Sequence, residues 1–157
     1  MGLPMAGRLV KAGYPLVAWN RTREKALPLE PLGAEVASTL DEAVKSADMV
    51  ITMLEAGPVV KSVVQPVLRE GTLLIDMSST KQSEAREIRQ MLEPRRVAFL
   101  DAPVSGGVVG AEAGTLAIMV GGTEKDFQRA RPVFEVMGRP TLVGPTGSGQ
   151  IAKLCNQ

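Results

Sequence analysis

Residues 48–80, DMVITMLEAGPVVKSVVQPVLREGTLLIDMSST, contain two apolar runs on either side of a segment with helical character. The runs cover residues 48–54 and 72–77, and both are continuous rather than alternating between apolar and polar side chains. Continuous runs of this length are typical of strands that are buried on both faces. We therefore expect a strand, a helix that breaks at Pro66, and a second strand parallel to the first.

The alternation of strands and helices extends in both directions from this unit. A helix that begins near Thr22 is interrupted by Pro28 and Pro31, and Ser38 is expected to cap the next helix, with Asp41 at the capping-box position. The pattern predicts an α/β fold, a Rossmann-type doubly wound, mostly parallel sheet. The further strands are expected at residues 14–19, 34–37, 96–100, 115–120 and 141–143, and the helices at residues 1–12, 38–46, 81–93, 123–137 and from 147 onward.

The composition excludes several classes of function. A length of 157 residues suits one domain, and a net charge of +1 gives no reason to expect nucleic acid or an anionic membrane as a partner. No apolar run reaches about 18 residues, so no transmembrane helix is expected. The chain has no histidine, the commonest general base and usual zinc ligand, and we expect no metal site. Because Cys155 is the only cysteine, no internal disulfide can form, and a cytoplasmic location is expected.

Groups suited to a ligand follow four of the predicted strands. In a parallel α/β sheet, ligands bind at the carboxyl ends of the strands. Because four strand ends are each followed by such a group, the sequence favours a binding site for a nucleotide or a small acid. The groups are Asn20-Arg21-Thr22, Leu54, Ser78-Ser79-Thr80 and Ser105-Gly106-Gly107.

The loop that begins at Ser105 is a candidate carboxylate site. Gly106 and Gly107 have no side chains, so their N–H groups stay uncovered and a ligand can approach the main chain closely. Gly110 and Gly114 are expected to extend this loop up to the next strand. The alternative is an ordinary turn between strands, because glycine and serine are common in turns.

The first turn departs from a complete dinucleotide fingerprint. Such a fold begins with a strand and a G-x-G-x-x-G turn, whose amide groups and helix N-terminus hold the pyrophosphate. Here Met1 and Gly2 lead directly into a helix, so Gly2 is expected at the place of the last glycine and the first strand is expected to be missing. Its loss would leave two neighbouring strands without a partner. The alternative is that Gly2 has no such role and the fold differs.

Arg21 and Thr22 bear on the choice of cofactor. An acidic side chain at this strand end would bind the ribose hydroxyls of NAD, whereas an arginine beside a hydroxyl suits the additional phosphate of NADP. The sequence therefore favours NADP, with NAD possible. The alternative is a solvated arginine at the end of a strand.

Lys153 is the candidate for acid–base chemistry. It lies near the start of the last predicted helix, where Gln150, Asn156 and Gln157 share its polar face. A lysine beside a nicotinamide can give a proton to an alcohol oxygen or take one from it. The alternative is a plain surface lysine.

Taken together, these residues resemble the β-hydroxyacid dehydrogenase family. That family includes 3-hydroxyisobutyrate dehydrogenase, tartronate semialdehyde reductase (2-hydroxy-3-oxopropionate reductase) and, more distantly, 6-phosphogluconate dehydrogenase. The resemblance implies hydride transfer between NAD(P) and a β-hydroxyacid or its semialdehyde. The motifs that carry it are MGLPMA at residues 1–6, AGY at 12–14, WNRT at 19–22, DAPVSGG at 101–107 with GTL at 114–116, and GSGQIAK at 147–153.

The resemblance also implies roles for single residues. Lys153 is implied as the general acid in reduction and the base in oxidation. The family often has an asparagine where this chain has Gln157, and Asn156-Gln157 resembles the tartronate semialdehyde reductases, which favours a semialdehyde as substrate. The implied substrate-binding residues are Ser105, Gly106, Gly107, Asn156 and Gln157, and the implied cofactor-binding residues are Gly2, Leu3, Asn20, Arg21, Thr22, Leu54 and Thr80.

The resemblance divides the chain in two. Residues 1–145 are expected to form an NAD(P)-binding domain that is incomplete at its N-terminus. Residues 146–157 are expected to begin a helix that, in the family, leads to an all-helical second domain. That domain supplies the dimer contacts, so a homo-oligomer is implied for the full-length enzyme, and little or no activity is expected from this chain alone. The alternatives are a non-catalytic nucleotide-binding or assembly module and an inactive fragment.

Overall fold

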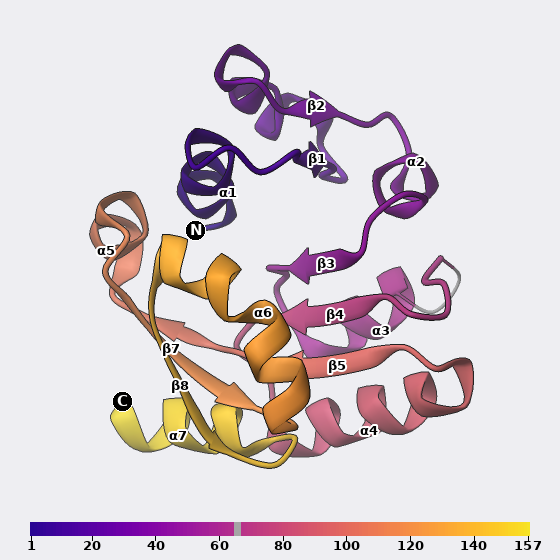
Figure 1. The fold of residues 1–157 in the computed structure, drawn as a ribbon, viewed down its shortest axis with the longest axis vertical. Helices are drawn as coiled ribbons and strands as arrows, with labels where there is room; N and C mark the ends of the chain where they lie inside the picture. The colour runs from indigo at the N-terminus through magenta and orange to yellow at the C-terminus, as the bar shows by residue number, and fades with distance from the viewer. Residues whose placement is uncertain (65–66) are drawn as a thin grey trace.

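The main sheet of the molecule has six strands in the order β3-β4-β5-β7-β6, with β8 paired to β7 beside this path. The structure is a computed structural model that describes residues 1–64 and 67–157. Strands β3 (Met49–Thr52), β4 (Leu73–Asp76) and β5 (Ala98–Asp101) run parallel to one another, and they lie side by side in the middle of the molecule (Figure 1). The parallel pair predicted from residues 48–80 is confirmed. The predicted break at Pro66 lies outside the described residues.

The second half of the sheet contains both strand directions. β7 (Leu116–Gly121) is antiparallel to β5 and to the short β6 (Val104–Ser105). β8 (Gly138–Gly144) is parallel to β7 and pairs with it from its first to its last residue, with a register shift that leaves Val143 out, so it is longer than the three residues predicted at 141–143. The sequence signal for β8 was weak because glycine and proline are poor strand formers. The predicted Rossmann-type α/β fold with a mostly parallel sheet is confirmed.

Two short strands form a separate sheet. β1 (Val17–Ala18) pairs in parallel with β2 (Glu35–Val36). Within residues 1–64 and 67–157, β1 pairs with no other strand, and β3 pairs only with β4. Among the described residues, β1 and β3 thus each keep one edge without a partner, as expected above. The strand predicted at residues 14–19 is limited to two paired residues.

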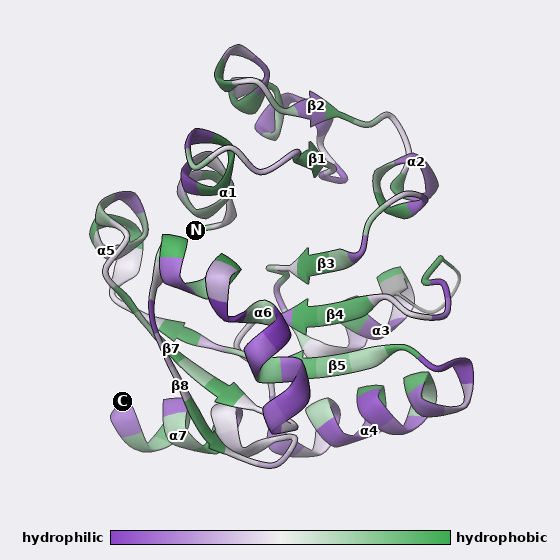
Figure 2. Ribbon diagram, viewed as in Figure 1, coloured by the Kyte–Doolittle hydropathy of each residue, from purple (hydrophilic) through white to green (hydrophobic). Residues whose placement is uncertain are grey.

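Helices cover both faces of the main sheet, and each covered face has its own apolar cluster. Leu73 and Ile75 of β4 pack toward α1 (Gly2–Lys11) and α6 (Glu124–Met137). Leu74 packs on the other face, against α3 (Gly57–Val64) and α4 (Gln82–Leu92). The strands β3 to β5 are accordingly apolar up to their last residues, whereas α4 and α6 carry hydrophilic residues at intervals (Figure 2). This is the physical reason for the continuous apolar runs in the sequence.

Several helix boundaries differ from those predicted. The helix expected at residues 38–46 is the shorter α2 (Leu40–Val44), and its cap is Thr39 rather than Ser38. Thr39 Oγ1 accepts the Glu42 N–H at 3.2 Å, and Ser38 instead donates its N–H to the Glu42 carboxylate. The segment with Pro28 and Pro31 forms two 3₁₀ helices, η1 (Arg23–Lys25) and η2 (Leu27–Leu32), because proline tolerates these short turns better than an α-helix. A third, η3 (Glu93–Arg95), follows α4.

The prediction of a loop after Ser105 is wrong, because the residues that follow Gly106 form the helix α5 (Gly107–Ala113). Gly114 ends the helix in the left-handed region, with φ 72°. Gly110 is a packing glycine, because a Cβ added there would lie 3.2 Å from Leu116 Cδ2. Both glycines were expected in a loop, whereas Gly110 permits close helix–strand contact and Gly114 ends the helix.

Candidate active site

Three polar residues lie side by side at the carboxyl ends of the central strands. Thr52 is paired with Asp76 across β3 and β4, and Asp76 is paired with Asp101 across β4 and β5. All three are buried, and both carboxylates have no exposed surface. Polar groups buried in this way need partners, so the contacts of each define how the site is built.

Asp76 organises the loop that follows β4. Its Oδ1 accepts hydrogen bonds from the Thr52 hydroxyl at 3.0 Å and from the Ser78 N–H at 3.1 Å, while Oδ2 has no partner among residues 1–64 and 67–157. Burial raises the pKa of the Asp76 carboxyl, and the hydrogen bonds from Ser78 and Thr52 oppose that rise. Ser78 Oγ in turn accepts the Leu54 N–H at 2.8 Å. The loops after β3 and β4 are therefore joined through Ser78.

Asp101 holds the start of α7 (Ser148–Asn156). Its Oδ1 accepts the Gly147 N–H at 2.7 Å, and its Oδ2 accepts the Gln150 N–H at 3.1 Å. Burial raises the pKa of the Asp101 carboxyl, and the N–H donors of the helix start oppose that rise. A Cβ at Gly149 would collide with the Met119 carbonyl oxygen and lie 2.8 Å from Asp101 Oδ2. The glycine motif before Lys153 thus lets α7 pack directly on the sheet.

The predicted proton donor lies in the middle of this helix. Lys153 is half-buried, and its ammonium has no hydrogen-bond or ion-pair partner in the part of the chain that the structure describes. Asn156, one turn further on, donates from Nδ2 to Ser105 Oγ at 3.3 Å. The structure therefore brings together two of the predicted substrate-binding residues, Asn156 at the end of the Lys153 helix and Ser105 at the end of β6. Gln157 is exposed and directly follows α7.

The predicted carboxylate turn has a backbone that favours glycine. Gly106 has φ 140° and Gly107 has φ 63°, both in the region that side chains disfavour. Ser105 ends β6 and Gly107 begins α5, so the turn lies between two ordered elements. The first N–H groups of a helix have no partner within the helix and remain available to an acceptor.

The predicted cofactor residues at the start of α1 meet the loop after β3. Gly2 and Leu3 open the helix, and no side chain caps its N-terminus. A Cβ at Gly2 would lie 3.7 Å from Met53 Cβ, so the helix start and the residue before Leu54 are close together. An uncapped helix N-terminus with a glycine at its first position fits the pyrophosphate of a dinucleotide.

Thr80 gives a second observation that fits a dinucleotide. Its N–H donates to Gln150 Oε1 at 3.0 Å, whereas its Oγ1 is buried without a partner among the described residues. A buried hydroxyl without a partner is costly unless a ligand or water satisfies it. The hydroxyl is therefore available to a polar group of a bound cofactor.

Asn20, Arg21 and Thr22 form a turn of their own after β1. Asn20 Oδ1 accepts the Thr22 N–H at 3.1 Å, and all three residues are exposed. The turn follows β1 of the two-stranded sheet, so its position depends on how that sheet packs against the main sheet and its helices. The structure leaves the Arg21 guanidinium free to meet a ligand from solvent.

Sequence reasoning missed the residues that hold the site together. Thr52, Asp76 and Asp101 were not among the predicted site residues. Ser78 and Gln150 were noted only as neighbours of Thr80 and Lys153, without the contacts that they make. A signal was present, because β4 and β5 are apolar strands that each end in a single aspartate. A carboxylate at the last position of a buried strand is expensive to bury without donors, which predicts N–H or hydroxyl groups facing it.

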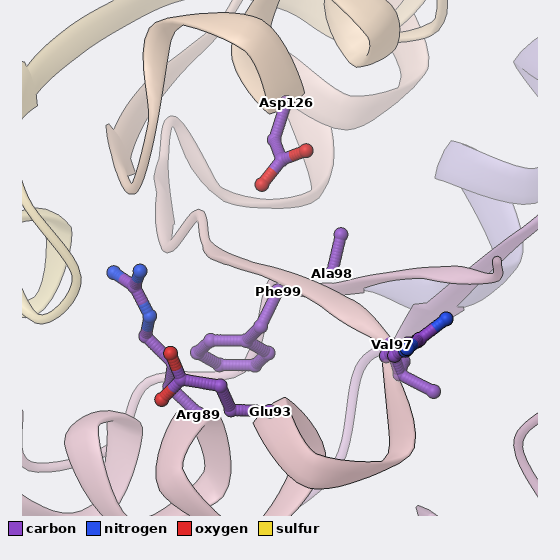
Figure 3. Close-up of a pocket in the computed structure, with 7 residues that line it drawn as sticks. Arg89, Glu93, Val97, Ala98, Phe99 and Asp126 are labelled. Carbon is purple, nitrogen blue, oxygen red and sulfur yellow. The ribbon is translucent and has the colours of Figure 1, made fainter. Parts of the chain in front are cut away.

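Two cavities among the described residues lie away from this site. One, of about 270 Å³, lies at the opposite end of β5 from Asp101, with Arg89 and Glu93 on one side, Asp126 across from them, and the Phe99 ring between (Figure 3). The other, of about 320 Å³, adjoins it and is lined by Arg86, Arg89, Gln90, Glu93, Pro145 and Thr146. Neither contains a predicted catalytic or cofactor residue, so we assign the site to the carboxyl edge of the sheet.

Neither a metal site nor a membrane-spanning helix is found in the part of the chain that the structure describes. Within residues 1–64 and 67–157, no group of three or more acidic, cysteine or histidine side chains could hold a metal ion. In the same part of the chain, no helix is long and apolar enough to cross a membrane.

Comparisons with known proteins give a consistent result. Residues 1–147 match the family model described as the NAD binding domain of 6-phosphogluconate dehydrogenase. The chain is 42% identical to an NAD-dependent L-serine dehydrogenase of Pseudomonas aeruginosa, over 99% of the chain and 55% of that protein. It is 45% identical to a probable 3-hydroxyisobutyrate dehydrogenase of Mycobacterium tuberculosis, over 99% of the chain and 54% of that protein. The chain thus spans about half the length of the curated relatives it matches.

Solved structures agree with the sequence comparison. The 3-hydroxyisobutyrate dehydrogenase of Mycobacterium tuberculosis with L-serine has a TM-score of 0.96 and 44% identity, covering 99% of this chain and 55% of that one. The structure of Psf3 in complex with NADP+ and 2-OPP has a TM-score of 0.94 and 27% identity, covering 99% of this chain and 58% of that one.

Proposed function

The chain belongs to the 6-phosphogluconate dehydrogenase NAD-binding family, with 3-hydroxyisobutyrate dehydrogenases among its relatives, and on this premise we propose that it supplies the cofactor-binding and proton-transfer half of a hydroxyacid dehydrogenase. The reaction is the interconversion of a β-hydroxyacid and its semialdehyde. The nicotinamide, when bound, supplies or accepts the hydride. Residues 1–145 form the NAD(P)-binding part in this proposal, and residues 146–157 carry the lysine.

One observation carries the proposal. The helix α7 is held at its start by Asp101 and near its end by the Asn156–Ser105 hydrogen bond. Lys153 lies between them, and its ammonium has no partner in residues 1–64 and 67–157. A proton donor must be held within hydrogen-bond reach of the atom that it serves. The arrangement places an available ammonium on an anchored helix that also contacts the proposed carboxylate turn.

The substrate half of the site consists of groups that recognise a carboxylate. We assign the substrate carboxylate to the Ser105 hydroxyl and to the N–H groups of Gly106 and Gly107, whose positive φ angles leave them uncovered. Asn156 and Gln157 orient the remainder of the substrate. Lys153 Nζ donates its proton to the substrate oxygen in reduction and accepts it in oxidation.

The cofactor half consists of the α1 N-terminus and the loops after β1, β3 and β4. Gly2 and Leu3 would hold the pyrophosphate, while Thr80 would offer its unpartnered hydroxyl to the nicotinamide half. Leu54 would contact the cofactor from the loop after β3. Asn20, Arg21 and Thr22 would bind the adenosine ribose and its substituent.

We propose NADP as the preferred cofactor, with NAD possible. The support is the exposed Arg21 beside Thr22, since a guanidinium can bind a phosphate with two hydrogen bonds. The relatives include an NAD-dependent enzyme and a structure with NADP+. The substrate is expected to be a small β-hydroxyacid such as L-serine, which the solved structure of one relative contains. A reducing compartment and a homo-oligomer are part of the same proposal for the whole protein.

The test begins with cofactor binding by the purified chain. NADPH and NADH are added separately, and the melting temperature is measured; we expect an increase with NADPH at lower concentration than with NADH. Arg21→Gln should remove most of the difference between the two cofactors. If neither dinucleotide changes the melting temperature, the proposed cofactor site is wrong.

The second stage of the test concerns Lys153. Lys153→Ala should leave the NADPH-dependent shift in place, because the side chain takes part in proton transfer rather than in holding the cofactor. Any turnover of L-serine or 3-hydroxyisobutyrate should fall by about 10²–10⁴-fold in kcat. The alternative function, a non-catalytic nucleotide-binding module, is favoured if the cofactor binds and Lys153→Ala changes no measurable rate.

A further inference from the structure

Gln150 connects α7 to the loop after β4. Its side chain is 4% exposed, and both ends of its amide are used. Nε2 donates to the Ser78 carbonyl at 2.9 Å, and Oε1 accepts the Thr80 N–H at 3.0 Å. A buried amide is costly unless donor and acceptor are both satisfied, and here both meet the main chain of the same loop.

The main chain of the same residue is held as well. The Gln150 N–H donates to Asp101 Oδ2 at 3.1 Å, beside the bond from the Gly147 N–H to Oδ1. One residue therefore contacts the end of β5 through its backbone and the loop after β4 through its side chain. Its position is determined by two neighbouring strands rather than by α7 alone.

Lys153 follows Gln150 by three residues. In a helix, residues at this spacing lie on one face, and their Cα atoms are about 4.5 Å apart along the axis. A shift of Gln150 would therefore move Lys153 by nearly the same amount. Thr80, at the other end of the Gln150 contact, carries the hydroxyl that we assign to the cofactor.

We propose that Gln150 is a positioning residue that fixes Lys153 relative to the loop of Ser78 and Thr80. The inference rests on the proposed function, which gives Lys153 its role as proton donor. The Gln150 side chain faces the loop and does not take part in proton transfer. It sets the separation between the lysine and the proposed nicotinamide side of the site.

The test uses Gln150→Met, a side chain of similar length that can form neither bond. Hydrogen exchange of the amides at residues 151–156 is measured by mass spectrometry or NMR. Loss of two hydrogen bonds should accelerate local exchange by roughly tenfold or more. Acetylation of Lys153 by acetic anhydride should also become faster relative to the exposed Lys11 and Lys125, because the lysine is less restrained.

Arg8→Met is the matched control. Arg8 also makes two side-chain hydrogen bonds to main-chain carbonyls, but these belong to Val136 in α6 and Glu112 in α5 rather than to α7 or the loop after β4. This variant should lower the melting temperature and leave the exchange of residues 151–156 and the Lys153 acetylation ratio at wild-type values. Equal effects of the two variants on these local measurements would overturn the proposal, as would wild-type values for Gln150→Met.

If the Gln150→Met variant does not fold, Gln150→Glu tests whether Gln150 positions Lys153. The glutamate keeps an oxygen for the Thr80 N–H and loses the donor to the Ser78 carbonyl, so exchange at residues 151–156 should lie above that of the wild type. Wild-type exchange in this variant would contradict the inference. These measurements need neither bound cofactor nor turnover, so failure of the proposed function, seen with Lys153→Ala and NADPH, is a separate outcome.

Where turnover can be measured, the kinetic constants give a further readout. Gln150→Met should lower kcat and leave KM for the hydroxyacid nearly unchanged, because the Ser105 turn is not touched. A rise in KM alone would assign Gln150 to substrate binding and overturn the positioning role.

Discussion

At the scale of single residues, the two buried aspartates differ in how well their charge is satisfied. Both oxygens of Asp101 accept N–H groups of α7, whereas Asp76 Oδ2 has no partner among the described residues. The pKa of each carboxyl is raised, and burial is the largest cause for both. Ionisation of Asp76 therefore destabilises the folded state more than ionisation of Asp101 does.

This difference predicts how stability depends on pH. Because the folded pKa of Asp76 lies above its unfolded value, the folded state holds the proton more strongly, and the contribution to stability is present at low pH and lost as the pH rises through the folded pKa. Asp76→Asn keeps an oxygen for Thr52 and Ser78 and removes the charge. The variant's free energy of unfolding should exceed that of the wild type by about 1–3 kcal/mol at neutral pH.

The measurement is urea unfolding at a series of pH values. The advantage of Asp76→Asn should shrink as the pH falls through the raised pKa of the folded Asp76 carboxyl, because the wild-type side chain then becomes neutral as well. Asp101 is present in both proteins, so its own titration cancels in the difference. A difference that is constant with pH would show that Asp76 does not ionise with a raised pKa in the folded chain.

At the scale of elements, close packing of α7 on the sheet depends on one glycine. Gly149→Ala would place a Cβ against the Met119 carbonyl and 2.8 Å from Asp101 Oδ2, both of which are part of the sheet. The helix must then move outward, and we expect a loss of about 1–3 kcal/mol in the free energy of unfolding. Lys153 should move with the helix.

Gly7→Ala is the control for this prediction. Gly7 is also a helical glycine, but its added Cβ would lie 3.6 Å from Leu32 Cδ1, an ordinary contact. Alanine is favoured over glycine inside a helix, so this variant should gain up to about 1 kcal/mol. If chemical denaturation shows the two variants to be equally stable, α7 is not held against the sheet as the structure describes.

The sequence was informative about elements and less so about their contacts. The apolar runs of β3 and β4 were readable because burial on both faces leaves each strand apolar up to its last residue, Thr52 or Asp76. Helix α5 was missed because its glycines have different surroundings: Gly106 and Gly110 face Leu116, Gly114 faces Arg8, and Gly107 has open space. The letters alone do not separate a turn glycine from a packing glycine. The motif around Lys153 was found by spacing, whereas its link to Thr80 through Gln150 depends on side-chain geometry that spacing does not contain.

At the scale of the whole molecule, Arg8 joins elements that are far apart in the sequence. From α1 its guanidinium donates to the carbonyls of Val136 in α6 and Glu112 in α5, both at 3.0 Å. Carbonyls in the last turn of a helix carry partial negative charge and lack a partner within the helix, so a cation there is favourable. Together with buried Met5 and Leu9, this residue fastens α1 to the larger sheet.

Arg8→Met should therefore destabilise the fold by about 1–3 kcal/mol. Thermal and urea unfolding give the measurement. Arg131→Met removes only an exposed pair with Glu135 and should change stability by less than about 0.5 kcal/mol. Comparable losses in the two variants would mean that the Arg8 contacts carry no special share of the stability.

The separate β1-β2 pair also affects how the molecule opens. Since no strand among the described residues joins β1 to β3, the two sheets are linked mainly by the packing of α1, and local unfolding of the smaller sheet requires less free energy than unfolding of the whole. A protease would then reach the segment around Pro28 and Pro31 while the larger sheet is still folded. A dinucleotide that contacts both sheets would suppress this opening, so resistance to proteolysis would report on the joining of the two parts.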